Sequence, residues 1–312
     1  MQIPKMLASV PPSRWRLLAW LVPSLLVLAV LVVVAAKGLR TIPEVQDFMT
    51  TYPGRSELPA GAPVGFPVWL NWSHFLNVFF LVFIVRTGWE LRQKKRPAAF
   101  WTRRNEGVIR TKNPPVRIGV PLWFHLVIDA FWVLNGVLYV VLLFGTGQWM
   151  RVIPTTWDVF PNAISVGSQY ASLVWPLENG WVNYNALQLL SYFVTIFIAA
   201  PLALVTGIRM APGFAARFRP IERVFPVALA RGIHFPVMIY FVGFVIVHVT
   251  LVLATGAQRN LNHMYAGRDD DSWLGFVFFG ASIVVMVVAW VLAKPSALAD
   301  AAEKTGTVRR TS

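Results

Sequence analysis

The sequence contains no cysteine among its 312 residues. This absence excludes disulfide bonds, zinc sites with thiolate ligands, iron–sulfur clusters and haem attached through thioether links. Charged residues are also scarce, at 13%, whereas a soluble domain carries roughly 25%. Hydrophobic residues make up 56%, which excludes a disordered chain. One soluble core could not bury the apolar surface of so many hydrophobic residues. We therefore predict an integral membrane protein.

Six apolar segments have the length of about 20 residues that crosses a bilayer. The first could be a signal peptide, but its apolar run exceeds the roughly 7–15 residues of a signal core, so we expect a retained span. Neither internal repeats nor strand-like alternation are found. The fold class predicted is all-α and integral to the membrane, with residues 1–293 as a single transmembrane domain and residues 294–312 as a disordered tail. The six segments are 17–36, 68–87, 120–146, 184–207, 233–255 and 273–293.

The net charge is +14. In a chain this apolar, we interpret the excess of basic residues as a signal for membrane topology, and we predict no nucleic-acid partner. The N-terminus and loops 86–118, 209–232 and 294–312 together carry +17. The remaining loops, 37–67, 147–183 and 256–272, carry −2. Because positive loops stay in the cytoplasm, we expect a multi-pass protein of the plasma or bacterial inner membrane with both termini cytoplasmic.

Two loop segments have alternative interpretations. The basic run 92–96 is either a topology signal or a patch for anionic lipid, and the first interpretation is favoured. The loop 147–183 is rich in aromatic residues, which is typical of an interfacial belt and is also suited to docking a partner. Within it, residues 158–175 are predicted to form a helix lying at the membrane interface.

Four of the five histidines fall at membrane depth. An ionisable residue there is costly and is a functional candidate, although any one of them could be a hydrogen-bonded structural histidine. The fifth, His263, precedes three aspartates in a loop and is predicted to be solvated. The four are His74, His125, His234 and His248.

The spacing of these histidines sorts them into pairs. His234 and His248 are 14 residues apart, about 40° short of four helical turns, so both lie on one helix face, ~21 Å apart along the axis. The predicted topology places His74 at the outer level with His248, and His125 at the inner level with His234. Two axial imidazoles fill the coordination of a haem iron that transfers electrons. We predict two haems, and the absence of cysteine makes them b-type.

Other uses of the histidines fit less well. A zinc or copper site needs clustered ligands, and a proton relay needs a continuous file of ionisable groups, whereas Asp129 is the sole intramembrane acid. Asp129 could orient a ligand histidine, move protons for a quinone, or pair structurally with Asn135. Gly136 and Gly243 would admit a flat macrocycle or close helix packing. Pro236 disfavours helix at Phe235, so the fifth helix either begins near His234, with Pro236 in its first turn, or is kinked there.

Several segments around these residues match a known family. They are Trp72-Ser-His74-Phe-Leu-Asn77 running to Arg86-Thr-Gly88, Arg231-Gly-Ile-His234, and Val247-His248-Val249. On these segments the chain resembles the di-haem cytochrome b subunits of nickel–iron hydrogenases, formate dehydrogenase N and thiosulfate reductases. It looks more narrowly like the membrane cytochromes that accompany molybdopterin oxidoreductases of sulfite-oxidase type. That narrower likeness rests on Tyr52-Pro-Gly54, Arg151-Val-Ile-Pro154-Thr-Thr-Trp157-Asp-Val-Phe-Pro161 and Glu178-Asn-Gly-Trp181-Val-Asn-Tyr-Asn185.

The resemblance implies a four-helix haem core over about residues 68–255. Its ligand pattern, one histidine on each of the first two core helices and two on the fourth, is matched by His74, His125, His234 and His248. It also implies that the chain is an electron-transfer subunit of a respiratory oxidoreductase complex. In that role it would link the quinone pool to a separate oxidoreductase of the molybdopterin type on the outer side. The extra N-terminal span would invert the core relative to the usual cytochrome. The competing hypotheses are a haem-free membrane anchor and a transporter.

Overall fold

The computed structural model describes residues 12–93, 95–107, 110–112, 114–175, 179–214, 218 and 220–311. Six of its helical segments are long and apolar enough to cross a membrane, which confirms the predicted all-α membrane fold. Many of their large apolar side chains are exposed and few are fully buried, as expected for surfaces that face lipid. The segments are α1 (Pro12–Leu39), α3 (Val68–Arg92), α4 (Val120–Gly145), the fourth span Ala186–Met210, α10 (Val227–Ala254) and α12 (Leu274–Leu292).

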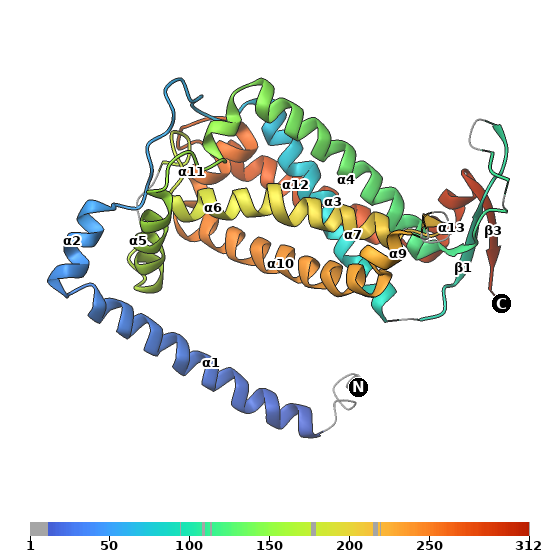
Figure 1. Cartoon of the computed structure of the whole chain (residues 1–312), viewed down its shortest axis with the longest axis horizontal. Helices are drawn as coiled ribbons and strands as arrows, with labels where there is room; N and C mark the ends of the chain where they lie inside the picture. Colours follow the sequence, from blue (N-terminus) through green and yellow to red (C-terminus); the bar gives the residue numbers. More distant parts are fainter. Residues whose placement is uncertain are drawn as a thin grey trace. The chain divides into compact units, whose positions relative to one another are not determined.

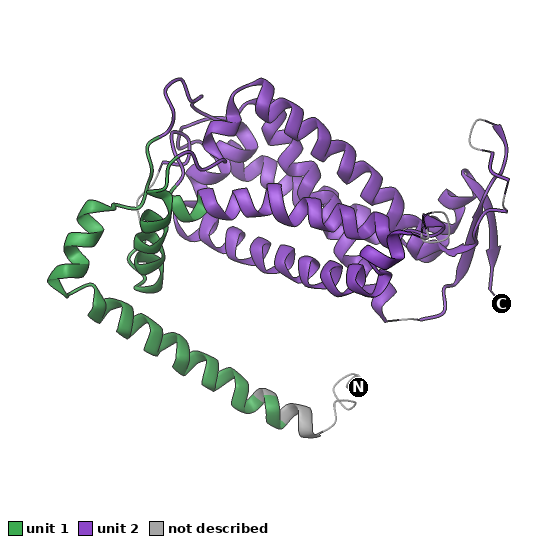
Figure 2. Ribbon diagram, viewed as in Figure 1, with its two compact units in different colours: residues 1–57, 156–178, 185–188 green, residues 58–155, 179–184, 189–312 purple. Residues whose placement is uncertain are grey.

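The chain divides into two compact units, coloured separately in Figure 2. Unit 1 contains residues 1–57, 156–178 and 185–188, and unit 2 contains residues 58–155, 179–184 and 189–312. Lys94, Glu178 and the side chain of Arg14, which belong to predicted charge runs and motifs, lie outside the described parts of the chain.

The helices of unit 2 pack in pairs. α3 lies against α4, and α7 (Ala200–Met210) lies against α10, as can be followed in Figure 1. α10 begins at Val227 and contains Pro236 in its interior, so the alternative in which this helix begins near His234 is wrong. Seven residues of helix precede His234, and the bundle packing around them outweighs the local preference of a residue before proline.

The fourth span contains an irregular turn. It runs through α6 (Ala186–Val194), a π-helical segment (Thr195–Ala199) and α7. Pro201 follows this segment and has no backbone N–H to donate to the preceding turn. The widened turn accommodates the carbonyl that this proline leaves without its usual donor, which is a common cause of such bulges.

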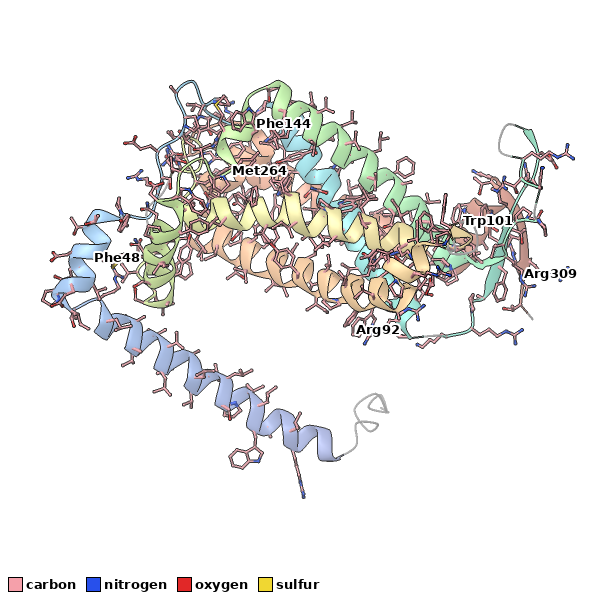
Figure 3. The ribbon with its side chains drawn as sticks, viewed as in Figure 1. Phe48, Arg92, Trp101, Phe144, Met264 and Arg309 are labelled. Atoms are coloured by element: carbon pink, nitrogen blue, oxygen red, sulfur yellow. The ribbon has the colours of Figure 1, made fainter. Side chains whose placement is uncertain are left out.

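One end of unit 2, called here the sheet end, carries a small antiparallel sheet. Its strands are β1 (Ala99–Arg103), β2 (Ile118–Gly119) and β3 (Gly306–Arg310), in the order β2-β1-β3. Trp101 pairs with Val308 and Phe100 with Arg309, and Figure 3 labels Trp101 and Arg309 there. The helix α13 (Pro295–Glu303) buries Ala299 and Ala302 against β1 and the start of α4.

The sheet corrects two sequence-based expectations. Residues 295–310 form a helix and a strand, so the expected disordered tail is not found there. The strands were also not anticipated. Their pairing joins segments about 200 residues apart in the chain, and the apolar residues that bury the sheet come from α4 and α13, so no local alternation marks them.

The opposite end of unit 2, the loop end, is built from short turns. These are a 3-10 helix (Gln148–Arg151), α11 (Ala257–Leu261) and a π-helical segment (Asn262–Ala266). Asn262 joins them to α12, because its side chain donates to the carbonyl of Ser272 at 2.6 Å and accepts from Gly275 N–H at 2.6 Å. A further short helix, α9 (Ile221–Val224), precedes α10.

Unit 1 combines α1, α2 (Pro43–Thr51) and α5 (Val159–Ala171). The predicted helix within 158–175 is thus confirmed as α5. Gly54 has φ of 109° and its N–H donates to Asn162 at 2.8 Å, while a Cβ there would lie 2.8 Å from Val166. The Tyr52-Pro-Gly54 segment therefore requires glycine both for its backbone conformation and for its packing on α5.

Candidate functional site

His74 of α3 and His248 of α10 face one another inside unit 2. Their ring centroids are 6.3 Å apart, with the ring planes at 57°. Two imidazoles bound on opposite sides of one metal ion, each at about 2 Å, hold their centroids roughly 6 Å apart. The Nδ1 atom of His74 is buried and has no hydrogen-bond partner among the described residues. Both observations fit a pair of axial ligands.

Aromatic rings surround this pair. Phe244 stacks on His248 at 5.6 Å with an interplanar angle of 7°, and Tyr192 meets the same imidazole edge-on at 6.0 Å. Tyr265 contacts His74 edge-on, also at 6.0 Å. These rings fix the two imidazoles by packing, and they provide the apolar wall that a flat macrocycle requires.

His125 of α4 and His234 of α10 form the second pair. Their helices both approach the same glycine of α3: a Cβ at Gly88 would lie 3.7 Å from Cε1 of His125 and 3.5 Å from Sδ of Met238, which is one turn after His234 on α10. A threonine hydroxyl contacts each ring: Thr87 lies 2.6 Å from Nδ1 of His125, and Thr206 lies 2.8 Å from Nδ1 of His234. The structure thus brings together both pairs that the sequence predicts, and α10 carries one member of each.

Asp129 lies one turn after His125 on α4. Its carboxylate is 3.5 Å from Nε2 of His125. Asn135 instead exchanges hydrogen bonds with Ser73, whose hydroxyl donates to the Asn135 amide oxygen at 3.1 Å. The expected alternative of an Asp129–Asn135 pair is therefore not found, and the contact with a candidate ligand histidine is the one observed.

A cavity of about 610 Å³ lies between α3, α10 and α12. This volume is in the range of roughly 300–1,000 Å³ typical of ligand sites. The wall is apolar along its length, and the polar groups gather where α3 ends. Its lining residues are Val78, Leu81, Val82, Val85, Arg86, Trp89, Glu90, Gln93, Val242, Val245, Ile246 and Trp290.

Arg86, a basic residue in this wall, is engaged by the end of α12. It donates to the carbonyls of Trp290 at 3.0 Å and Ala293 at 2.8 Å, and its guanidinium lies 4.4 Å from the Trp290 ring centroid. Because carbonyls at a helix C-terminus lack intrahelical donors, Arg86 acts as a cap that joins α3 to α12.

The mid-span glycines have open space beside them. A Cβ added at Gly136 or Gly243 would meet no atom within 4 Å. Close helix–helix packing at these two positions is therefore excluded among the described residues. Gly136 lies on nearly the same face of α4 as His125 and leaves room for a bound group. Gly243 is exposed on the face of α10 away from His234 and His248, so its open space is not part of their site.

His263 is buried, at 3% exposure, so the prediction that it is solvated is wrong. Its ring lies between Phe66, at 5.9 Å, and Trp181, at 5.3 Å, and its Nε2 donates to Asp269 at 2.8 Å. Burial lowers the pKa of His263, although Asp269 opposes the shift. Hydrogen bonds from Arg259 and His263 hold the pKa of Asp269 well below its usual range.

Arg151 is a second buried group that the sequence reasoning did not single out. It is 1% exposed and donates to the carbonyls of Gly65 at 2.5 Å and Gly180 at 2.6 Å. It is the one basic residue of loop 147–183, which is the signal that could have marked it. Arg151 ties together two of the segments on which the narrower family resemblance rests.

Comparisons with protein-family models, with curated proteins and with solved structures each return no match. Within the described ranges there is also no group of three or more histidine, cysteine, aspartate or glutamate residues arranged to hold a metal ion. The candidate ligands are therefore the two histidine pairs.

Proposed function

We propose that this protein transfers electrons across a membrane through two bis-histidine b-type haems. His74 and His248 would hold one iron, and His125 and His234 the other. The observation that carries the proposal is the 6.3 Å separation of the His74 and His248 rings, which matches the spacing of two imidazoles on one metal ion. The open space beside Gly136 supports it.

Bound haem supplies one-electron redox chemistry, and the protein supplies ligation, orientation and burial. With both axial positions filled by histidine, the iron binds no substrate. The residues that hold the rings are hydrogen-bond acceptors at one level and aromatic rings at the other. Electron transfer between the haems needs no side chain as an acid, base or nucleophile, and the chain is proposed as an electron-transfer subunit of a respiratory complex.

The electron donor or acceptor within the membrane is proposed to be a quinone. The cavity between α3, α10 and α12 combines an apolar wall with polar side chains at one end, which suits a ring with an isoprenoid tail. Asp129 is the candidate for proton exchange, because it is the one acidic residue predicted within a span.

The second redox partner is proposed to be a separate oxidoreductase of the molybdopterin type on the outer face. This part rests on the family resemblance and on the distribution of charge, which favours a cytoplasmic location for both termini. In that orientation the His74–His248 level lies toward the partner and the sheet end lies in the cytoplasm.

A haem-free transporter is the second candidate, and one observation favours it. The Asp129 carboxyl lies 3.5 Å from Nε2 of His125 inside a span, and chains of such ionisable groups form proton pathways in membrane proteins. Haem ligation through His125 Nε2 and proton transfer through that atom exclude one another. Haem content therefore separates the two functions.

The deciding experiment is a reduced-minus-oxidised visible spectrum of the purified protein, combined with a pyridine haem assay. We expect two b-type haems per chain. The variant His248→Leu should lose one haem and retain the other. His263→Gln removes the fifth histidine and should retain both. A wild-type chain without haem, or a His248→Leu variant with two haems, would refute the proposal.

A further inference from the structure

Two Thr-Gly pairs occupy equivalent positions in unit 2. Thr87-Gly88 lies on α3 and contacts His125 of the neighbouring α4, while Thr206-Gly207 lies on α7 and contacts His234 of the neighbouring α10. A Cβ on Gly88 would lie 3.7 Å from Cε1 of His125, and one on Gly207 would lie 3.6 Å from Cε1 of His234. Each imidazole thus lies against a threonine and the glycine after it.

The hydrogen bonds of the two threonines fix the direction of the contact with histidine. Thr87 Oγ1 lies 2.7 Å from the carbonyl oxygen of Phe83, and Thr206 Oγ1 lies 2.5 Å from that of Leu202. A carbonyl only accepts, and a hydroxyl has one proton to donate. With that proton directed to the carbonyl, the hydroxyl oxygen accepts from Nδ1–H of the imidazole.

This direction determines the tautomer of each ring. A neutral imidazole carries one proton, so a protonated Nδ1 leaves Nε2 with a free lone pair. Both threonines are buried, at 2% exposure for Thr87 and 1% for Thr206, so water does not compete for the bond. The ring of His234 is therefore held ready to bind a metal ion through Nε2, and so is that of His125, where the Asp129 carboxyl, 3.5 Å from Nε2, would have to give way to the metal.

We propose that Thr87 and Thr206 are positioning residues that set the tautomer of His125 and His234 and lower the reduction potential of the haem they hold. The inference rests on the proposed function. A hydrogen bond from Nδ1–H to an acceptor raises the basicity of a ligating imidazole. A more basic ligand stabilises the oxidised iron, so the potential falls.

The other pair provides an internal reference. Nδ1 of His74 has no hydrogen-bond partner in the described part of the chain, and His248 is held by stacking on Phe244. Two threonine acceptors therefore act on one haem, whereas the described residues show no such acceptor bonded to either ring of the other pair. The inference predicts two distinct potentials, with the lower one belonging to the haem of His125 and His234.

The test is a spectroelectrochemical redox titration of purified variants, with haem content measured alongside. Thr87→Val and Thr206→Val keep the side-chain shape but remove the acceptor. Each should raise the lower potential, the double variant should raise it further, and the higher potential should stay unchanged. Thr87→Ser retains the hydroxyl and should restore the wild-type value.

Thr195→Val is the matched control. Thr195 also donates to a carbonyl one turn back, at 2.7 Å, but its second partner is the Tyr240 hydroxyl rather than a histidine. It should move neither potential. If a valine variant loses its haem, the serine variant carries the test, and loss of haem from Thr87→Ser as well would overturn the inference.

The outcomes separate this inference from the proposed function. A wild-type chain without haem overturns both. Two haems in the wild type with unchanged potentials in the valine variants overturn the role of the threonines and leave the proposed function standing. Equal shifts in Thr195→Val and Thr87→Val would show a general packing effect and would also overturn it.

Discussion

The two histidine pairs are held by different forces, although each takes one histidine from α10. At the His125–His234 level, hydrogen bonds to buried hydroxyls orient both rings. At the His74–His248 level, stacked and edge-on aromatic rings surround the imidazoles. Hydrogen bonds act on the electronic properties of a ligand, whereas ring packing acts on its position. Under the proposed function, one bundle would therefore hold two like cofactors and give them unlike properties.

The largest expected effect is the loss of the haem held by one histidine pair. His74→Leu should leave one haem per chain with the lower potential, and His125→Leu should leave one haem with the higher potential, because each replacement removes an axial ligand from a different iron. Haem content and a redox titration of both variants check this. The same potential for the haem that remains in each variant would contradict the difference between the levels.

Gly275→Ala should disturb the His74–His248 level through its support. A Cβ at Gly275 would lie 2.3 Å from the backbone nitrogen of Asn262, which begins the segment that carries Tyr265. We expect a loss of about 1–3 kcal/mol in unfolding free energy, as for an overpacked core, measured by thermal melting in detergent.

Gly280→Ala is the control for this change. It lies on the same helix, and a Cβ there would meet no described atom within 4 Å. Its melting temperature should stay close to that of the wild type. If both variants melt alike, the close approach of α12 to the π-helical segment is not important for stability.

Phe244→Leu should weaken haem binding by the His74–His248 pair and leave haem binding by the other pair unchanged. It removes the ring stacked on His248 while it keeps an apolar side chain, at a cost of about 1 kcal/mol. Haem at the His74–His248 level should dissociate roughly fivefold more readily, and haem at the other level should be unaffected. Transfer of haem to an acceptor protein measures both dissociation rates, because the haem that remains at each level is identified by its reduction potential.

The smallest expected effect is a dependence of the local stability of the loop end on pH. Because burial lowers the pKa of His263, the unfolded segment binds a proton more readily than the folded one. Stability from this residue is complete above its ordinary pKa of about 6.5 and falls as the pH drops below that value. Asp269, whose pKa is also lowered, contributes a loss in the same direction only at more acidic pH.

Hydrogen exchange of residues 257–272 at several pH values measures this effect. Protection should decrease below about pH 6.5. His263→Phe keeps a ring between Phe66 and Trp181 and should remove the dependence in that window. Protection that is the same at pH 5 and pH 7 in the wild type would show that the histidine does not contribute.

Local composition was sufficient to predict the six spans and the facing of His74 and His248. Spans are set by apolar length, and the register of two histidines on one helix follows from its period. Placing His74 level with His248 required only that successive spans run in opposite directions, and the two rings do meet. The haem, quinone and oxidoreductase assignments stay predictions.

Features that depend on distant segments were not predictable from one stretch of sequence. His263 is followed by three aspartates, which suggested a solvated residue, but Phe66 and Trp181 from elsewhere in the chain cover its ring. Thr87 and Thr206 are ordinary helix residues until the neighbouring helix brings a histidine to each. The strand β3 gains its structure from β1, far away in the chain.

The pairing of β1 with β3 also bears on how the protein assembles. Four membrane spans, from α4 to α12, separate the two strands in the chain. During synthesis β1 would have an unpaired edge until all four are inserted, because its neighbour on that side follows the last of them. Closure of the sheet over such a long loop is entropically costly, so it is a late step. A closed sheet would then indicate that the whole bundle has been inserted.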